Sequence, residues 1–378
     1  MKKMLMTAAV PSMIGQFNMN NIIILLDMGY EVHVACNFRD YSYWPKKRIK
    51  EFVEELKKLG VKYHQIEYSR SPKEIIKIRR SFRQLDKLLK VENYAFVHCH
   101  TPMAGAISRI CCHRNGVKVI YTAHGFHFYK EAPIQNWLIY YPIEKLLSCW
   151  TDVLITITKE DYRRAKKDLY SRKTVYIPGV GVCTRKFYNI KLDRKKKRNE
   201  IGILPDDFMI LSVGELNQNK NHKKVVEALS MIKDCNCHYF IAGQGILEQE
   251  LKEEGRRYGI HLHLLGYRDD IPELLNCADL FVLPSIREGL NVSLMEAVSS
   301  GLPSIASDIR GNRELIGREY LFNPNSAEDI CKLIIKVKNM DSITREKFIS
   351  NLLQSSCQLD TKVISKKMKE IYVRYFDM

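Results

Sequence analysis

Residues 279–301 read DLFVLPSIREGLNVSLMEAVSSG. The stretch opens as a short apolar strand that ends at Pro284–Ser285, passes through a polar loop, and continues as a helix expected to start near Asn291. Two glutamates eight residues apart, Glu288 and Glu296, stand on either side of this loop-to-helix junction. The free N–H groups and the positive dipole end of a helix start favour a diphosphate.

A carboxylate accepts two hydrogen bonds and therefore holds a vicinal diol well. The junction accordingly fits a nucleotide-sugar, with sugar hydroxyls near Glu288, the diphosphate at the helix start and a ribose diol at Glu296. Acids near a helix start also complement its dipole without any ligand. The spacing by itself leaves both interpretations open.

The same order of strand, loop and helix recurs along the chain. Strand patterns in the first half are KMLMTAAV, EVHVAC, KYHQI, AFVHC, VKVIYTA, DVLITI and TVYIPG, and in the second half FMILSVG, HYFIAGQG, HLHLLG, DLFVLPS, LPSIAS and YLF. Helical patterns separate most of them. This alternation predicts an α/β protein with two Rossmann-like domains, each a parallel sheet covered by helices on both faces, facing across a cleft.

A basic segment divides the two halves. Residues 191–200 read KLDRKKKRNE and are predicted to be solvated. We expect an N-terminal domain over 1–187, a basic linker over 188–200 and a C-terminal domain over 201–358. The final helical stretch, 359–378, has no strand after it and is expected to pack back on one of the domains, in the first instance the N-terminal one.

Composition narrows the class of protein. The chain has 378 residues, of which 46% are hydrophobic and 27% charged, which fits a globular protein of two domains. The chain contains no run of about 18 apolar residues, so no membrane-spanning helix is predicted. The start, MKKMLMTAAVPSMIG, fits a buried first strand better than a secretion signal. Eleven cysteines without any Cys-x-x-Cys pair indicate reduced thiols of a cytoplasmic protein, and no metal site is predicted.

The net charge of +17 is concentrated in one half. Residues 1–187 carry 32 Lys and Arg against 16 Asp and Glu, whereas residues 188–378 carry 28 against 27. Such a surface attracts phosphates or an anionic membrane leaflet. An unspecialised solvated face remains the alternative.

Ligands of open parallel sheets bind beyond the carboxyl ends of the strands. In the second half, the loops that follow strands are GELNQNK (214–220), GQG (243–245), GYRDD (266–270), PSIREGLN (284–291) and SDIRGN (307–312). Each contains glycine, which lets backbone approach a ligand closely. These loops are predicted to form one binding rim.

Taken in order, several stretches resemble retaining family 4 glycosyltransferases of GT-B fold. The stretch with Glu288 and Glu296 resembles the E-x7-E motif, and VGELNQNKNHKKVVEAL, IAGQG, LGYRDDIPELLNCADLFVLPS and GLPSIASDIRGNRELI resemble the donor domain of that family. VHCHTPMAGAISRI, YTAHGFHFYKEAPIQNWLIYYPIEKLLS, TDVLITITKEDY and YIPGVGV resemble a branch that builds capsular, exopolysaccharide or O-antigen repeat units. The resemblance covers most of residues 1–320.

The resemblance implies roles for the residues of the second domain. Glu288 contacts the transferred sugar, Glu296 binds ribose, and Lys220 binds the diphosphate. Glu215 stands where relatives commonly have arginine, so its implied part is limited to support, for example ordering Lys220. Other residues implied in donor binding are Gly214, Gly243, Tyr267, Arg268, Gly289, Leu290, Asn291 and Val292.

In the first domain the resemblance places His124 beside the donor sugar as a catalytic residue. The residues expected on the acceptor side are Ser12, Gly15, Asn18, His100 and His127. Strand alternation puts His98 and His100 on one face without a third metal ligand. Aromatic residues of 134–150 either receive a lipid-linked acceptor at the membrane interface or belong to a buried helix.

The function implied is transfer of a hexosyl or N-acetylhexosaminyl unit from a nucleotide-diphosphate sugar, UDP-linked in the first instance, to a polyprenyl-diphosphate-linked saccharide. Configuration is retained, no cofactor or metal is expected, and the protein works at the inner face of the plasma membrane. One alternative is a sugar-nucleotide epimerase of the same fold. A nucleic-acid-binding protein is a second alternative suggested by the charge, although no recognised binding module supports it.

Overall fold

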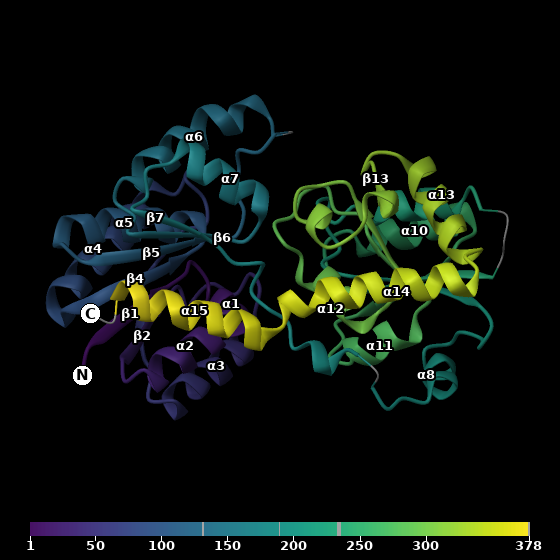
Figure 1. Cartoon of the computed structure of the whole chain (residues 1–378), viewed down its shortest axis with the longest axis horizontal. Coiled ribbons are helices and arrows are strands. Elements are labelled where there is room, and N and C mark those ends of the chain that lie inside the picture. Colours follow the sequence, from purple (N-terminus) through teal and green to yellow (C-terminus); the bar gives the residue numbers. More distant parts are fainter. Residues whose placement is uncertain (131, 189, 233–235, 377–378) are drawn as a thin grey trace. The chain divides into compact units, whose positions relative to one another are not determined.

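The computed structural model describes residues 1–130, 132–188, 190–232 and 236–376. The chain divides into two compact units, Met1–Val180 with Val363–Met378, and Gly181–Lys362. Each unit contains one sheet whose described strands all pair in parallel, with helices packed around it (Figure 1). The two predicted Rossmann-like domains are confirmed.

The sheet of the first unit has the strand order β3-β2-β1-β4-β5-β6-β7. Its strands are β1 (Lys3–Thr7), β2 (Glu31–Cys36), β3 (Lys62–Gln65), β4 (Tyr94–His100), β5 (Lys118–Ala123), β6 (Val153–Thr156) and β7 (Lys173–Tyr176). Its helices are α1 (Pro11–Phe17), α2 (Met19–Asp27), α3 (Lys46–Lys58), α4 (Ile75–Glu92), α5 (Pro102–Asn115), α6 (Ile134–Ser148), α7 (Lys159–Asp168) and α15 (Thr361–Phe376).

Helices cover both faces of this sheet because each buries one apolar stripe. One core joins the sheet to α1, α2, α3 and α15, and α3 contributes Ile49, Phe52 and Leu56 at helical spacing. The core on the opposite face joins the sheet to α4, α5 and α7, and α4 contributes Leu85 and Leu89. The central strands are therefore buried on both sides, which is why they are continuously apolar.

The sheet of the second unit has the order β10-β9-β8-β11-β12-β13. Its strands are β8 (Phe208–Val213), β9 (Cys237–Ala242), β10 (His261–Gly266), β11 (Leu280–Leu283), β12 (Ser304–Ser307) and β13 (Leu321–Phe322). Its α-helices are α8 (Arg194–Glu200), α9 (His222–Leu229), α10 (Glu248–Tyr258), α11 (Ile271–Cys277), α12 (Val292–Ser300), α13 (Ala327–Lys338) and α14 (Ser342–Ser356). Short 3-10 helices are η1 (Thr184–Lys186), η2 (Asn312–Glu314), η3 (Arg318–Tyr320) and η4 (Cys357–Leu359).

Both sheets reverse their strand order at one point. The reversal lies between β1 and β4 in the first unit and between β8 and β11 in the second. At such a point the connections leave in opposite directions, and a crevice opens beyond the carboxyl ends of the two strands. The loops after β1, β4, β8 and β11 are therefore placed to form binding sites.

The predicted solvated linker over 188–200 is wrong in its second part, while residue 189 lies outside the described residues. Residues 194–200 form α8, in which Lys197 and Arg198 are buried. Arg198 donates to the carbonyl of Cys277 and to a carboxylate oxygen of Asp279, 2.5 Å away. Because buried charges need such partners, the pairing turns a basic run into part of the second unit.

The boundary between the units also differs from the predicted position at 187. Residues from Gly181 belong to the second unit. The N–H of Val182 donates to the carbonyl of Leu359 over 2.9 Å, and the N–H of Thr361 donates to Val182 over 2.9 Å. The chain is tied there to the segment that precedes the last helix.

The last helix, α15, packs into the core of the first unit through Ile364, Met368, Ile371, Tyr372 and Phe376. The chain thus returns to the first unit from Val363 onward, whereas the residues just before it, up to Lys362, belong to the second unit. None of the described helices combines the length and apolarity needed to cross a bilayer.

Candidate active site

The loops that follow β8 and β11 meet at the point where strand order reverses in the second unit. There the ammonium of Lys220 lies 2.7 Å from a carboxylate oxygen of Glu288, and both side chains are mostly buried. The amide of Asn219 donates to the carbonyl of Arg287 over 3.0 Å, and the N–H of Ile286 donates to Asn219 over 2.8 Å. Side chain and backbone together hold the two loops in contact.

Asn221 fixes the same junction, and sequence reasoning missed it. Its backbone is left-handed, with φ of 54°, a conformation that asparagine tolerates better than other residues with a side chain. Its amide donates to the carbonyls of Pro284 and Pro324 over 3.2 and 2.8 Å. The only local signal is an asparagine at the N-cap of the helix that follows Lys220.

The helix start at Asn291 lies where the sequence predicted it. The side-chain oxygen of Asn291 accepts the N–H of Leu294 over 3.0 Å, which caps α12. The hydroxyl of Ser293 lies 2.9 Å from the carbonyl of Val213, at the end of β8. The first N–H groups of α12 have no intrahelical partner and carry the positive end of its dipole. Among the described residues, the N–H groups of Leu294 and Met295 donate to Asn291, so those of Val292 and Ser293 are the ones available to an anion.

Glu296 lies about one turn inside α12. No hydrogen bond or ion pair joins its carboxyl group to any described residue. Burial raises the pKa of this carboxyl to about 7. Glu296 is half-buried, and an acid largely removed from water without partners is costly unless a ligand supplies donors. The arrangement is suited to a diol that donates two hydrogen bonds.

Glycines of the rim permit very close contact between loops. A Cβ at Gly243 would lie 1.8 Å from the carbonyl oxygen of Gly214, and a Cβ at Gly311 would lie 1.5 Å from that of Gly289. A Cβ at Gly214 would lie 3.2 Å from the Lys220 side chain. Two of the predicted donor-binding glycines, Gly214 and Gly243, therefore have a packing role that holds whether or not a ligand is present.

The remaining residues predicted to bind the nucleotide-sugar differ in how free their side chains are to contact a ligand. Tyr267 is 80% exposed, so its ring is free to stack on a base. Arg268 instead forms a two-point ion pair with Asp270. Glu215 is exposed, and Lys220 pairs with Glu288 rather than with Glu215. Leu290 is buried, and Val292 is the first residue of α12.

In the first unit three histidines form a row: His98 and His100 are buried in the last part of β4, and His124 is half-buried just after β5. The rings of His98 and His100 lie 4.3 Å apart, and Nδ1 of His100 lies 3.2 Å from Nε2 of His124. Burial lowers the pKa of His98 to about 3 and that of His124 to about 4, so both imidazoles are neutral near pH 7.

The histidine row continues into α15. Nδ1 of His98 is 2.9 Å from the hydroxyl of Tyr372, and its Nε2 is 2.8 Å from the hydroxyl of Thr122. Within the described part of the chain, Nε2 of His100 has no hydrogen-bond partner. His100 and His124 line a cavity of about 30 Å³ together with Asn18, which is buried and donates to the carbonyl of Met13. Sequence reasoning missed Tyr372, because nothing local links it to the histidines.

A larger cavity of about 490 Å³ opens where strand order reverses in the first unit. It is lined by residues that follow β1 and β4, among them Ser12, and by His127 and Tyr140, whose rings stack 4.6 Å apart. Apolar side chains dominate its wall, and Arg70 supplies a cation. Of the predicted acceptor-side residues, Ser12 and His127 thus share this cavity, whereas Asn18 and His100 line the small one.

Thr101 carries a strained backbone in the wall of the larger cavity. Its φ is 66° and ψ is 146°, a region that residues with a branched Cβ rarely adopt. Its hydroxyl accepts the N–H of Ala9 over 3.1 Å, which joins the loops after β4 and β1. Strain of this kind is typical of functional sites.

Gly15, also predicted on the acceptor side, lies inside α1. A Cβ there would lie 2.4 Å from the ring of Trp44, so the residue permits close packing of α1. Among the described residues, no three His, Cys, Asp or Glu side chains gather in a way that could hold a metal ion.

Comparison with known proteins finds a glycosyltransferase family model in each unit. The family model described as Glycosyl transferases group 1 matches residues 193–354, and the one described as Glycosyl transferase 4-like matches residues 15–158. The chain is 34% identical to EpsD of Bacillus subtilis, named as a glycosyltransferase, over 100% of this chain and 98% of the relative.

A second relative is UDP-Gal:alpha-D-GlcNAc-diphosphoundecaprenol alpha-1,3-galactosyltransferase of Escherichia coli, 32% identical over 80% of this chain and 81% of that protein. A third, N,N'-diacetylbacillosaminyl-diphospho-undecaprenol alpha-1,3-N-acetylgalactosaminyltransferase of Campylobacter jejuni, is 25% identical over 86% and 89%. Among solved structures, Anabaena HepE in complex with UDP-glucose superimposes with a TM-score of 0.77 at 16% identity, covering 99% of this chain and 100% of that one.

Proposed function

Since the chain belongs to family 4 of the glycosyltransferases with GT-B fold, we propose that it transfers a hexosyl or N-acetylhexosaminyl unit from a UDP-linked sugar to a polyprenyl-diphosphate-linked saccharide, with retention of configuration. The transfer serves the synthesis of bacterial surface polysaccharide. The observation that carries the proposal is the grouping of Lys220, Glu288, the start of α12 and Glu296 in the second unit.

In this proposal the donor lies along the start of α12. Lys220 and the free N–H groups of the helix hold the diphosphate, Glu296 accepts the ribose hydroxyls, and Glu288 accepts hydroxyls of the sugar. Tyr267, being exposed at the end of β10, stacks on the uracil. Each charged or polar group of the nucleotide-sugar then meets a protein group of complementary charge or polarity.

The reaction breaks the bond between the sugar C1 and the diphosphate oxygen and forms a bond from C1 to the acceptor oxygen on the same face. The acceptor proton passes to the departing diphosphate. Lys220 and the helix dipole stabilise the charge that develops on the leaving group, which is the contribution expected of preorganised charges. Because these groups neutralise the diphosphate, the proposal needs no metal. For His124 of the first unit the catalytic role stays a prediction from the resemblance, and burial lowers its pKa to about 4, so the imidazole is neutral near pH 7.

The proposed acceptor site is the larger cavity of the first unit. Its apolar wall suits a lipid-linked molecule, and Arg70 suits the diphosphate of such a molecule. Two relatives whose names specify undecaprenol-diphosphate acceptors support this substrate class. The basic first half of the chain, with 32 Lys and Arg against 16 Asp and Glu over 1–187, suits the inner face of the plasma membrane.

The test is to incubate the protein with a panel of nucleotide-sugars and polyprenyl-diphosphate saccharides and to identify the product and its anomeric configuration. Glu288→Gln is expected to lower transfer by about 100-fold or more, because it removes a group aligned on the reacting sugar. Glu273→Gln, a partly exposed ion-pair partner on α11, is the matched control. Equal rates for Glu288→Gln and the parent would contradict the site. Conversion of the donor without any acceptor would favour an epimerase instead.

A further inference from the structure

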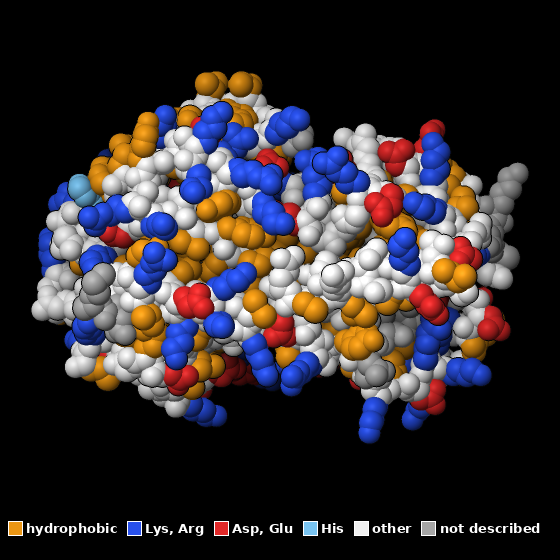
Figure 2. All heavy atoms as spheres, viewed as in Figure 1, with side chains coloured by type: hydrophobic (Ala, Val, Ile, Leu, Met, Phe, Trp, Pro, Cys, Tyr) orange, Lys and Arg blue, Asp and Glu red, His pale blue; other side chains and the backbone are white. Residues whose placement is uncertain are grey.

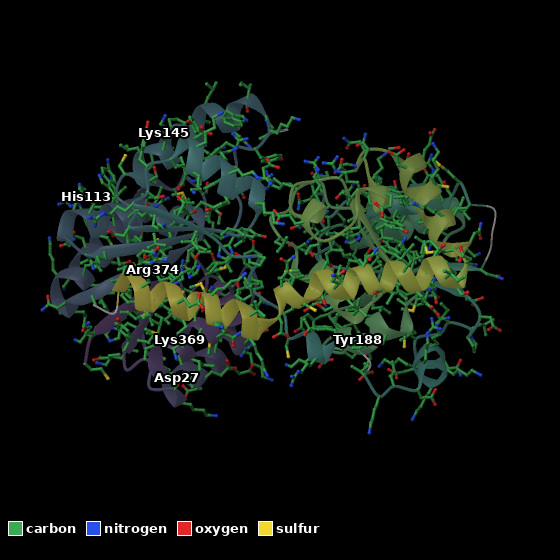
Figure 3. All side chains as sticks on the ribbon, viewed as in Figure 1. Asp27, His113, Lys145, Tyr188, Lys369 and Arg374 are labelled. Atoms are coloured by element: carbon green, nitrogen blue, oxygen red, sulfur yellow. The ribbon has the colours of Figure 1, made fainter. Side chains whose placement is uncertain are left out.

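The last helix, α15, carries the hydroxyl of Tyr372 into the core of the first unit. Lys369 and Arg374 of this helix are exposed, and Figure 3 labels both. Figure 2, drawn from the same side as Figure 1, shows charged side chains on the surface where α15 lies. Tyr372 instead is fully buried, and its hydroxyl lies 2.9 Å from Nδ1 of His98. A residue near the end of the chain therefore contacts the histidine row.

The hydrogen of the Tyr372 hydroxyl is directed to His98. Within the described ranges, Nδ1 of His98 is the one hydrogen-bond partner of this hydroxyl. A buried O–H without an acceptor is costly, and burial raises the pKa of Tyr372, so the phenol keeps its proton and donates it. The neutral His98 then has its single N–H on Nε2, from which it donates to the hydroxyl of Thr122 over 2.8 Å.

The hydroxyl of Thr122 is left with a hydrogen that needs an acceptor. It accepts from His98, and no other atom of the described residues hydrogen-bonds to it. Thr122 is 7% exposed and lines the same cavity of about 30 Å³ as His100. Nε2 of His100 is buried and also lacks a hydrogen-bond partner in the part of the chain that the structure describes. Two buried groups with unmade hydrogen bonds therefore border one small space.

A water molecule fits this space and satisfies both groups. A polar cavity larger than about 15 Å³ holds a water that has two to four polar partners. Asn18 and Asn21 also line the cavity. The water accepts from Thr122, so its own hydrogens need acceptors. Oδ1 of Asn18 already accepts from the amide of Asn21 over 3.0 Å, which leaves Nε2 of His100 as the acceptor without a donor.

The position of the proton on His124 follows from that on His100. Burial keeps His100 neutral, and because its Nε2 accepts, its single proton lies on Nδ1. Nδ1 of His100 lies 3.2 Å from Nε2 of His124 and donates to it, so the neutral His124 carries its own proton on Nδ1. Among the described residues nothing hydrogen-bonds to Nδ1 of His124, which leaves this N–H to a ligand.

We propose that the hydroxyl of Tyr372 and a water bound in the small cavity together fix the proton of His124 on Nδ1. The series of hydrogen bonds between them is called the histidine relay, and its members in order are Tyr372, His98, Thr122, the water, His100 and His124. The members before His124 are positioning residues. The consequence for catalysis rests on the proposed function and on the role predicted for His124. A fixed tautomer offers the sugar the same N–H in every turnover, whereas a mixture offers it in only part of the molecules.

The experiment is NMR of the full chain with ¹⁵N-labelled histidine, which reports the ring nitrogen that carries the proton in each neutral imidazole. His124→Gln assigns the signal of His124, and in the parent we expect the pattern of a proton on Nδ1. Tyr372→Phe and Thr122→Val each remove one hydroxyl of the relay with little change of shape. Each is expected to convert His124 to a mixture of both tautomers. Thr122→Ser keeps the hydroxyl and should restore the parent pattern.

Tyr30→Phe is the matched control. The Tyr30 hydroxyl is also buried and donates to α15, at the carbonyl of Phe376 over 3.1 Å, but it is not a member of the relay. This variant should keep the parent pattern. Thermal unfolding checks that each variant is folded, and if Tyr372→Phe does not fold, the pair Thr122→Val and Thr122→Ser decides. A proton on Nε2 of His124 in the parent, or a fixed Nδ1–H that survives loss of either hydroxyl, would overturn the proposal.

Kinetics of sugar transfer separate the relay from the proposed function. Tyr372→Phe and Thr122→Val are expected to lower kcat about tenfold at unchanged KM for the nucleotide-sugar, because only part of the molecules then holds the competent tautomer. Thr122→Ser is expected to restore kcat. If the tautomer changes but kcat does not, the relay stands and the role predicted for His124 fails. If the parent transfers no sugar to any acceptor, the proposed function fails and the NMR result alone decides the relay. A fall in kcat without a change of tautomer would contradict the relay.

Discussion

The ammonium of Lys220 lies 2.7 Å from a carboxylate oxygen of Glu288, although the two residues are 68 positions apart in the chain. Without ligand, the proposed diphosphate-binding cation thus has an internal counter-ion. A bound diphosphate would replace Glu288 as the main partner of Lys220 and leave the carboxylate to accept sugar hydroxyls. If Lys220 binds the diphosphate as proposed, this ion pair links donor binding to the orientation of Glu288.

Lys220→Met is expected to weaken UDP binding by roughly 10- to 100-fold, the effect of losing one charge-assisted contact with phosphate. Glu288→Gln should leave UDP binding equal or tighter, because it removes the competing carboxylate, while sugar transfer falls. Titration calorimetry with UDP measures both effects. Lys224→Met, whose lysine pairs with Glu227 one helical turn away, is the control. A loss of UDP affinity in Glu288→Gln equal to that in Lys220→Met would show that the pair is only structural.

Glu296 is expected to make stability depend on pH. Its folded pKa of about 7 lies above the ordinary value of 4.5, so the folded protein holds a proton that the unfolded chain releases between these values. The free energy of unfolding contributed by this group therefore falls as pH rises from 4.5 to 7 and is level above that. Glu296→Gln removes the titrating group and with it this pH-dependent loss of stability. The variant should unfold at a higher temperature than the parent at pH 8, by roughly 2 °C or more, with no gain at pH 4.

The same variant should bind UDP about tenfold more weakly at pH 8, because an amide accepts the ribose hydroxyls less strongly than a carboxylate. Thermal scans and UDP titrations across this pH range measure the two effects. Lower stability of Glu296→Gln at pH 8 would contradict the assignment of Glu296 as an unpaired, half-buried acid.

Gly243→Ala is expected to destabilise the second unit by about 1–3 kcal/mol and to abolish measurable UDP binding, because the new Cβ would lie 1.8 Å from the Gly214 carbonyl oxygen and push the rim loops apart. Gly60→Ala is a control with a left-handed φ of 73° and no atom within 4 Å of the new Cβ. Its cost should be about 1–2 kcal/mol from backbone strain alone, with UDP binding unchanged. Denaturant unfolding and calorimetry distinguish the two. Intact UDP binding in Gly243→Ala would mean that the loops adjust.

Arg70→Gln is expected to raise the KM for a polyprenyl-diphosphate acceptor about tenfold, the loss of one charge-assisted contact, without changing UDP affinity. The arginine lines the larger cavity and covers the ring of Tyr43, 4.4 Å from its centroid. Steady-state kinetics with the acceptor in detergent measure the change. Arg39→Gln, at an exposed position of the same unit, should leave the KM unaltered. An unchanged KM in Arg70→Gln would place the acceptor elsewhere.

Local patterns in the chain were sufficient to predict the strands and helices and, within the candidate site, the start of α12. Alternating apolar strands and helices fixed the two-sheet α/β architecture, because burial on both faces of a parallel strand requires continuous apolar runs. Asn291 marked the start of α12, because a capping side chain and the first helical N–H groups are only a few residues apart. Both features depend on interactions between near neighbours, which sequence alone records.

Only the tertiary structure decided the rest. The strand order that brings the loops of Lys220 and Glu288 together, the isolation of Glu296, and the link from Tyr372 to His98 all depend on contacts between residues far apart in the chain. Arg198 was predicted to be solvated and is buried, because Asp279 and the Cys277 carbonyl supply partners that no local pattern reveals. Helix α6 is apolar on almost every side, so its sequence does not specify which face meets the sheet and which meets solvent. Packing determines the buried face, because the aromatic rings contact the core of the first unit and Glu144 pairs with the buried Arg109.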